Sequence, residues 1–169
     1  MAMPISHCQY CGSPFGAAQP VKNQLLCAAC KRITYRNPLP VAVIIVPTVG
    51  GIWLVRRGVD PGRGRLALVS GFVEKGEDWR EAGAREVFEE INLIIPDPKR
   101  LIRVLEVEST PSGNEVLIFG IVEKWGTVEI GPFKPSEEAL ERSVFRFNEQ
   151  SEDFAFPLHE KMIRRYLKM

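Results

Sequence analysis

The run GFVEKGEDWREAGAREVFEEINL, residues Gly71–Leu93, is the densest group of carboxylates in the chain. Read at about 100° per residue, its second half places a stripe of apolar side chains on one face of a helix. The stripe consists of Ala84, Val87, Phe88 and Ile91. Asp78 stands where a helix N-cap is expected. The pattern therefore predicts a helix that begins after Asp78 and buries these four side chains.

Three glutamates lie on the opposite face of this helix, at spacing i, i+3, i+4. They are Glu86, Glu89 and Glu90. Carboxylates this close repel each other, which raises their pKa values unless a cation lies among them. Oxygen-rich clusters suit hard divalent ions such as Mg²⁺ or Mn²⁺. A metal site is one interpretation, and a solvent-exposed acidic face is the other.

The wider stretch resembles the Nudix box, G-x5-E-x7-R-E-U-x-E-E-x-G-U, in which U is aliphatic. The matching residues are Gly71, Glu77, Arg85, Glu86, Val87, Glu89, Glu90 and Leu93. Asn92 departs from the pattern, which has glycine there. Because this position follows the helix, where a left-handed backbone is often needed, asparagine is the next most tolerant residue.

The resemblance implies an α/β fold, namely a Nudix-type α/β/α sandwich with a mixed sheet. It also implies that water attacks a pyrophosphate link while metal ions neutralise the oxygens and activate the nucleophile. The implied ligands of Mg²⁺ or Mn²⁺ are Glu86, Glu89, Glu90 and the backbone carbonyl of Ser70. Glu77 and Arg85 would form a supporting ion pair that orients these glutamates.

Strand patterns dominate the rest of the chain. The β-branched run 41–46 is predicted as a buried strand that ends at Pro47, and a hairpin turn leads to a second strand at 52–57. Further strands are expected at 66–73, 101–108, 115–125 and 143–147, and a terminal helix at 157–168. The order indicates a mixed sheet covered by helices.

All four cysteines lie near the N-terminus, as two C-x2-C pairs formed by Cys8, Cys11, Cys27 and Cys30. Disulfides are the alternative, but this spacing without a secretion signal favours tetrahedral zinc. Four sulfur ligands leave no open position for water, so the zinc is expected to be structural. We predict a zinc ribbon over residues 1–33 and a Nudix hydrolase domain over 34–169, beginning with a linker at 34–40.

A ribbon followed by a Nudix domain resembles two groups of enzymes. NADH pyrophosphatases carry S-Q-P-W-P-F after the box, where this chain has EVESTPSGNEVLIF. FAD/ADP-ribose pyrophosphatases of the chloroplast type share the cysteine pairs, Tyr-x-Asn-Pro at Tyr35 and a late FAF segment at 154–156. Their Leu-Trp-Thr-Leu-Pro before the box is replaced here by RLALV. The second group is the better match, and the sequence leaves the substrate open.

Both groups use another glutamate beyond the box, which completes the metal site or acts as the base. The segment EEALERSVF aligns with that pattern and selects Glu138, with Glu137 and Glu141 as rivals. A solvent-exposed acid in a turn is the alternative for each of them.

Phe72 and Tyr35 match residues that stack on a nucleobase in the NADH pyrophosphatases, although a core role is equally open for Phe72. Four arginines near the 52–57 strand offer phosphate contacts. They are Arg56, Arg57, Arg63 and Arg65, and Arg57 is the one selected for substrate binding.

The chain has 169 residues, of which 45% are hydrophobic, and a net charge of +1, so it has no bulk attraction for nucleic acid or membrane. No signal peptide or membrane-spanning run is evident, which predicts a cytoplasmic protein. The relatives suggest a homodimer. The expected partner is a small nucleotide.

The leading hypothesis is a hydrolase that splits a nucleoside diphosphate-X compound, with FAD or ADP-ribose favoured, into two monophosphates. An NADH pyrophosphatase is one alternative. A nucleic-acid-binding, protein-binding or nucleotide-sensing module without activity is another, but such proteins typically lose box glutamates and this chain keeps them. An isomerase on the same scaffold would need a catalytic cysteine outside the ribbon, and the sequence has none there.

Overall fold

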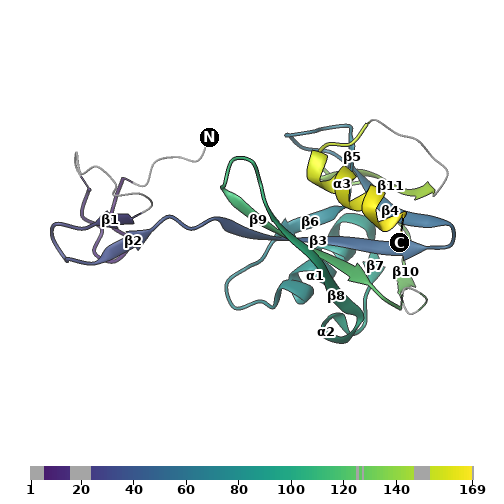
Figure 1. Ribbon diagram of the computed structural model, residues 1–169, viewed down its shortest axis with the longest axis horizontal. Coiled ribbons are helices and arrows are strands. Elements are labelled where there is room, and N and C mark those ends of the chain that lie inside the picture. Colours follow the sequence, from purple (N-terminus) through teal and green to yellow (C-terminus); the bar gives the residue numbers. More distant parts are fainter. Residues whose placement is uncertain (1–5, 16–23, 125, 127, 147–152, 169) are drawn as a thin grey trace. The chain divides into compact units, whose positions relative to one another are not determined.

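The computed structural model describes residues 6–15, 24–124, 126, 128–146 and 153–168. The chain divides into two compact units, Met1–Pro38 and Leu39–Met169. Figure 1 shows the elements of both. The second unit contains the sheet and the helices.

The first unit is a small β-hairpin joined to two tight turns. Strand β1 (Gln24–Leu26) pairs antiparallel with β2 (Ile33–Tyr35), and Leu25 faces Thr34 across the pair. The amide of Gly12 donates to the carbonyl of Cys8 at 2.9 Å, and that of Lys31 to the carbonyl of Cys27 at 2.9 Å. Strand β2 includes Thr34 and Tyr35, the first two residues of the linker expected at 34–40.

The second unit is built on a seven-stranded sheet in which β3 is central. The order along the main path is β11-β4-β3-β9-β8, with β5 paired to β4 and β6 paired to β3. The strands are β3 (Leu39–Thr48), β4 (Gly51–Arg57), β5 (Leu66–Ala67), β6 (Val69–Phe72), β8 (Ile102–Ser109), β9 (Glu115–Val122) and β11 (Ala139–Arg146). Strands β3 and β9 are parallel and the other pairs antiparallel, so the predicted mixed sheet is confirmed.

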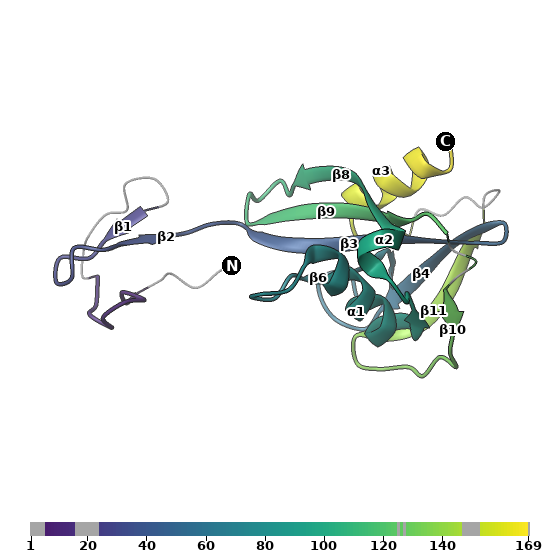
Figure 2. The same cartoon turned by 90° about the horizontal axis from the view of Figure 1, so that it is seen from below.

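Helices cover both faces of this sheet, as Figure 2 shows for α1 and α3. The helices are α1 (Trp79–Ile91), the short α2 (Pro98–Leu101) and α3 (Pro157–Tyr166). Strand β3 alternates between two cores, because Ile44 packs in the cluster of α1 and Ile45 in the cluster of α3. A two-stranded sheet of β7 (Leu93–Ile94) and β10 (Glu129–Ile130) follows the end of α1. The predicted α/β/α sandwich is confirmed.

Several boundaries differ from the sequence prediction. Strand β3 continues through Pro47, where Pro47 faces Ile52 of β4. The run 66–73 is two short strands, because β5 pairs with β4 while β6 pairs with β3. Strand β9 ends at Val122, β11 begins at Ala139, and α3 ends at Tyr166. Residue 147, expected as the end of a strand, lies outside the described residues.

Helix α1 begins as predicted. The side chain of Asp78 accepts a hydrogen bond from the amide of Arg80, and Glu81 completes a capping box. Its buried face is rotated from the predicted stripe, however. Gly83, which packs against Ile44, and Val87 are buried, whereas Phe88 is 51% exposed, so its predicted core position is wrong.

The side chain of Arg142, on β11, binds the C-terminal end of α1. The helix has no basic residue in its last turn, but Nη1 of Arg142 donates to the carbonyl of Ile91 at 2.8 Å and to that of Gly131 at 3.0 Å. The guanidinium lies over the rings of Trp53 and Phe133, at 5.0 and 5.7 Å from their centroids. It thus satisfies an end carbonyl and complements the helix dipole.

Candidate active site

The first glycine of the box, Gly71 on β6, lies against a carboxylate of α1. A Cβ atom at Gly71 would lie 1.9 Å from Oε1 of Glu86, so only glycine leaves room for this side chain. Strand β6 is held in register by β3, where Ser70 faces Val43. Glu86 is therefore fixed beside the backbone of the strand that carries Ser70 and Gly71.

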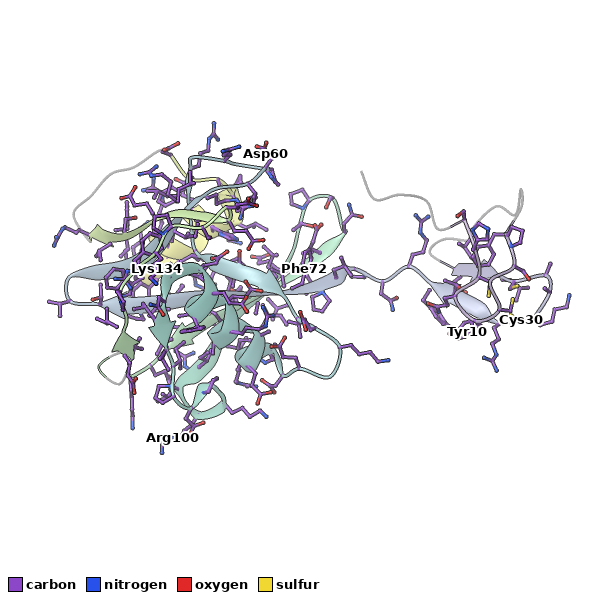
Figure 3. The ribbon with its side chains drawn as sticks, turned by 180° about the vertical axis from the view of Figure 1, so that it is seen from behind. Tyr10, Cys30, Asp60, Phe72, Arg100 and Lys134 are labelled. Atoms are coloured by element: carbon purple, nitrogen blue, oxygen red, sulfur yellow. The ribbon has the colours of Figure 1, made fainter. Side chains whose placement is uncertain are left out.

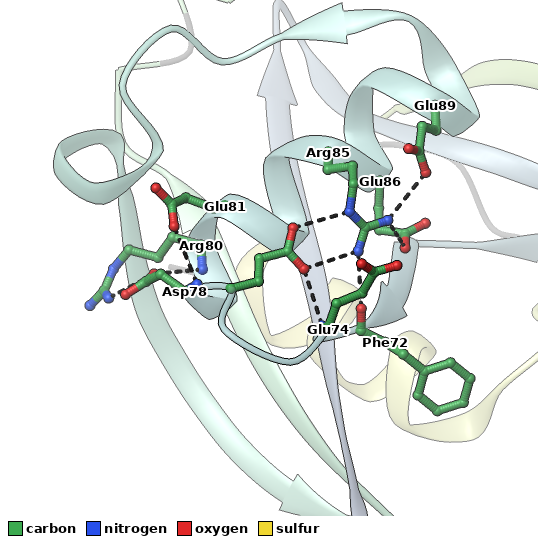
Figure 4. A network of polar contacts seen from close by, with 9 residues as sticks. Phe72, Glu74, Asp78, Arg80, Glu81, Arg85, Glu86 and Glu89 are labelled. Atoms are coloured by element: carbon green, nitrogen blue, oxygen red, sulfur yellow. Dashed lines mark hydrogen bonds and ion pairs between the residues drawn. The ribbon is translucent and has the colours of Figure 1, made fainter.

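Arg85 is the centre of an ion-pair network shown in Figure 4. Its Nε donates to Oε1 of Glu77 at 3.1 Å, and its Nη1 donates to Glu86 at 2.6 Å and to Glu89 at 3.2 Å. Nη2 donates to the carbonyl of Phe72 at 3.1 Å. Hydrogen bonding to Arg85 lowers the pKa of Glu77. Arg85 thus joins the turn, Glu77 and two box glutamates.

Glu90 differs from the other box glutamates because it is buried, with 7% of its surface exposed. Burial, followed by the charge of Glu86, raises its pKa to about 8, against the charge of Arg57 and a backbone hydrogen bond from Ser70. Its Oε2 is buried without a hydrogen-bond partner. An orphaned buried carboxylate oxygen is costly unless a cation or a proton satisfies it, so the donor set fits a divalent metal.

The three glutamates are not drawn into one tight cluster. Glu86 and Glu89 meet on Nη1 of Arg85, while Glu90 lies on the buried side of the helix. Burial raises the pKa of Glu86, and the charges of Glu89 and Glu138 add to this, while Arg85 opposes it. Mutual repulsion of this kind is relieved when a cation enters.

The charge of Glu138, the glutamate selected beyond the box, acts on two of the box glutamates. It acts to raise the pKa of Glu86 and of Glu90, although burial is the larger cause at both. Its backbone carbonyl accepts a hydrogen bond from the amide of Gly58 at 2.7 Å, which holds it at the end of β4. Glu141 is instead engaged with Arg56, at 2.8 Å.

The four candidate arginines separate in the same way. Arg56 pairs with Glu141 and lies 3.6 Å from Asp153, and Arg65 lies 3.8 Å from Asp153. Arg63 is exposed. Arg57 is half-buried and its charge acts on Glu90, so it is the arginine on the carboxylate side.

Both predicted stacking residues are accessible. The side chain of Phe72, labelled in Figure 3, is 55% exposed at the end of β6, which removes the core alternative. Tyr35 is 52% exposed on β2 of the first unit. The structure brings Phe72, but not Tyr35, into the same unit as the box.

The four cysteine sulfurs converge in the first unit, near the labelled Cys30 in Figure 3. One ligand atom from each lies within 4.8 Å of the others, and the Cys8–Cys30 and Cys11–Cys27 sulfur distances are 3.7 and 3.6 Å. A tetrahedron with Zn–S bonds of about 2.3 Å has sulfurs about 3.8 Å apart. The group therefore fits a structural zinc ion.

Thiol ionisation in this group is uneven. Hydrogen bonding to Ser13 lowers the pKa of Cys11 to about 6. A backbone hydrogen bond from Arg32 acts to lower the pKa of Cys30, but desolvation and the neighbouring thiols raise it to about 11. The cluster thus resists full ionisation without a cation.

Sequence reasoning missed Phe156, whose ring lies 4.9 Å from the guanidinium carbon of Arg57. The signal was the FAF segment, which was noted without a role for its second phenylalanine.

Among the described residues, no helix combines the length and apolarity that crossing a bilayer requires.

Comparison with known proteins identifies similar chains. A family model described as NUDIX domain matches residues 37–166. The ADP-ribose pyrophosphatase of Methanocaldococcus jannaschii is 34% identical over 135 residues, which cover 79% of this chain and 76% of the relative. The NAD-capped RNA hydrolase NudC of Salmonella heidelberg is 28% identical over 145 residues, covering 84% of this chain and 52% of NudC, so this chain spans about half that relative's length.

A solved structure agrees with these sequence matches. The crystal structure of a NUDIX hydrolase from Nitrosomonas europaea superposes with a TM-score of 0.72 at 26% identity. The match covers 97% of this chain and 91% of that chain.

Proposed function

The chain belongs to the Nudix family, and from this premise we propose that it cleaves the pyrophosphate bond of a nucleoside diphosphate-X substrate. The products are two monophosphates. ADP-ribose and FAD are the favoured substrates, ADP-ribose because the relative from Methanocaldococcus jannaschii is an ADP-ribose pyrophosphatase.

The burial of the Glu90 carboxylate is the single observation that supports this proposal best. A buried carboxylate whose Oε2 has no partner calls for a cation. Mg²⁺ or Mn²⁺ would be held by Glu86, Glu89, Glu90 and the backbone carbonyl of Ser70. The bound ion supplies charge neutralisation at the pyrophosphate oxygens and a lowered pKa for the attacking water.

The remaining roles are assigned to residues of the same unit. The Glu77–Arg85 ion pair orients the box glutamates, since Arg85 contacts both Glu86 and Glu89. Glu138 completes the site or accepts a proton from water, because its charge reaches Glu86 and Glu90 and it is exposed. Arg57 binds phosphate, as a planar guanidinium does.

Phe72 and Tyr35 are proposed to stack on the nucleobase. Exposure of the Phe72 ring next to the site supports its role.

The proposal also includes a structural zinc ion held by the four cysteines. It divides the chain into two domains, a zinc ribbon over residues 1–33 and a Nudix hydrolase domain over 34–169. We also propose a cytoplasmic homodimer, on the family resemblance alone.

A second candidate is hydrolysis of NADH or of a related NAD-linked substrate. It is favoured by the match to NudC, which extends over 84% of this chain. The lack of S-Q-P-W-P-F after the box speaks against it. A nucleotide-sensing protein without activity is the third candidate, and the complete set of box glutamates disfavours it.

A substrate panel with product identification tests the proposal. Purified protein is incubated with ADP-ribose, FAD, NADH, dinucleoside polyphosphates and nucleoside triphosphates, with Mg²⁺ or Mn²⁺. AMP with ribose 5-phosphate, or AMP with FMN, is the expected pair of products. Faster hydrolysis of NADH than of the other compounds would favour the second candidate. If no compound is hydrolysed with either ion, the third candidate, a nucleotide-sensing protein without activity, is favoured.

A further inference from the structure

Two adjacent arginines at the end of β4 have opposite surroundings. Arg56 donates to Glu141 at 2.8 Å and to the carbonyl of Gly64 at 2.8 Å. Arg57 has no carboxylate partner among the residues that the structure describes. Its Nε donates to the carbonyl of Pro61 at 2.9 Å, which leaves its two terminal nitrogens available for a ligand.

The guanidinium of Arg57 is supported by an aromatic ring. Its central carbon lies 4.9 Å from the ring centroid of Phe156, within the range of a cation–π contact. That ring is backed by His159, at 4.8 Å between centroids. His159 in turn is buried and contacts Phe119 edge-on. The ring under Arg57 is therefore held from behind by the core.

Backbone pairing brings this segment to Arg57. The amide of Leu66 donates to the carbonyl of Asp153, and the amide of Ala155 donates back to Leu66, at 2.9 and 2.8 Å. Leu66 lies on β5, which pairs with β4 directly beside Arg57. Phe156 then stands at the N-cap of α3 and packs against the core cluster on the α1 side of the sheet.

Arg57 lies beside Glu138, the glutamate selected beyond the box. It faces Ala139 where β4 pairs with β11, and the amide of the next residue, Gly58, donates to the carbonyl of Glu138 at 2.7 Å. The terminal nitrogens of a guanidinium can donate two parallel hydrogen bonds to phosphate oxygens.

We propose that Phe156 is a positioning residue that holds the guanidinium of Arg57 toward the pyrophosphate of the substrate. The inference rests on the proposed function. It makes the start of α3 part of the active site, although Phe156 itself touches neither substrate nor metal.

A double-mutant cycle on kcat/KM tests this. The variants are Arg57→Ala, Phe156→Leu and the double variant, with the best substrate of the panel. Phe156→Leu is expected to lower kcat/KM about three- to tenfold, the size of a cation–π contact. In the Arg57→Ala background the same change is expected to have no further effect, because coupled residues are not additive.

Two variants separate positioning from folding damage. Phe156→Tyr keeps an aromatic face and is expected to restore most of kcat/KM. Phe154→Leu changes a buried phenylalanine of the same segment, which contacts Phe145 rather than Arg57. It is expected to lower the thermal midpoint and to leave kcat/KM unchanged well below that midpoint.

A spectroscopic readout does not depend on activity. The Nε–H signal of Arg57 in a ¹H–¹⁵N spectrum is expected to shift in Phe156→Leu and to stay in place in Phe154→Leu. An unshifted signal, or an equal loss of kcat/KM with and without Arg57, overturns the inference. If the signal shifts but the wild-type protein hydrolyses nothing in the panel, the proposed function fails and the contact alone stands.

Discussion

Gly71 and Glu86 are packed so closely that a Cβ atom on Gly71 would lie 1.9 Å from Oε1 and 2.0 Å from Cδ of Glu86. The glycine is therefore required by a neighbouring carboxylate, since its own φ is not in the left-handed region. The first residue of the box and its central glutamate form one steric unit.

Gly71→Ala is expected to displace the Glu86 carboxylate and lower kcat/KM by about a hundredfold, the effect of losing a well-placed charged group. Gly126→Ala is the matched control, because a Cβ there would have no atom of the described residues within 4 Å. Steady-state kinetics with Mg²⁺ on both variants checks this. Equal kcat/KM in the two variants would contradict the assignment.

Glu90→Gln is expected to abolish the stabilisation of the protein by Mg²⁺. A ligand that binds only the folded state raises the thermal midpoint, and the orphaned Oε2 of Glu90 is the oxygen that a cation would satisfy. Without metal the midpoint is expected to change little, because burial raises the pKa of Glu90 to about 8 and keeps the acid neutral near pH 7. Differential scanning fluorimetry with EDTA or Mg²⁺ measures both. Glu74→Gln, an exposed neighbour, is the control and is expected to keep the Mg²⁺ response.

Substitutions of Asn92 test the one departure from the box pattern, which has glycine at this position. It ends α1 in the left-handed region with φ 51°, and its Nδ2 donates to the carbonyl of Pro132 at 2.6 Å. Asn92→Ala is expected to lower the free energy of unfolding by about 1–2 kcal/mol. Asn92→Gly relieves the backbone strain but loses the hydrogen bond, so a change within about 0.5 kcal/mol is expected. Urea titration measures both, and an equal loss in the two variants would refute this account.

His159 makes stability depend on pH. Burial, with a smaller contribution from the charge of Arg57, lowers its pKa from 6.5 to about 3. Between these values the unfolded chain binds the extra proton, so the free energy of unfolding falls as the pH drops below 6.5. The slope is at most about 1.4 kcal/mol per pH unit.

The comparison of wild type with His159→Leu isolates this effect. The variant lacks the titrating ring, so its free energy of unfolding is expected to fall less steeply below pH 6.5. Urea titrations at successive pH values give the two curves, which would be parallel if His159 played no part.

Zinc removal tests the first unit. Wild-type protein is expected to contain about one zinc per chain, and Cys27→Ser to contain almost none, because the variant removes one of the four thiolates that complete the tetrahedron. Loss of metal is expected to expose the first unit to proteases, since such small units depend on their metal. Ser6→Ala, outside the cysteine group, is the control. Metal analysis showing full zinc in Cys27→Ser would disprove the site.

Much of the fold follows from local pattern. The cap at Asp78, the left-handed Asn92 and the mixed sheet were predicted because each depends on residues close in sequence or on strand order. Phe88 was misplaced because the apolar stripe alone does not show which face meets the sheet. Gly83 against Ile44 decides that, and a glycine carries no hydrophobic signal.

In the candidate site, too, contacts between residues close in sequence could be predicted, and contacts between distant segments could not. The Arg85–Glu77 contact was predicted because the box brings both residues from one turn and helix. Arg57 was selected over its neighbour Arg56 on the same strand, but their different surroundings follow from the pairing of β4 with β11 and β5. The approach of Phe156 to Arg57 depends on tertiary contacts between distant segments, which a local pattern does not encode.

The central place of β3 has a consequence for how the chain reaches this state. Its hydrogen-bonding partners β4, β6 and β9 all follow it in sequence, and β9 pairs with it in parallel over Leu39–Ile45. Contacts of such long sequence separation slow folding. During synthesis one edge of this apolar strand stays unpaired until β9 has left the ribosome, so we expect aggregation and chaperone binding at this edge of the nascent chain.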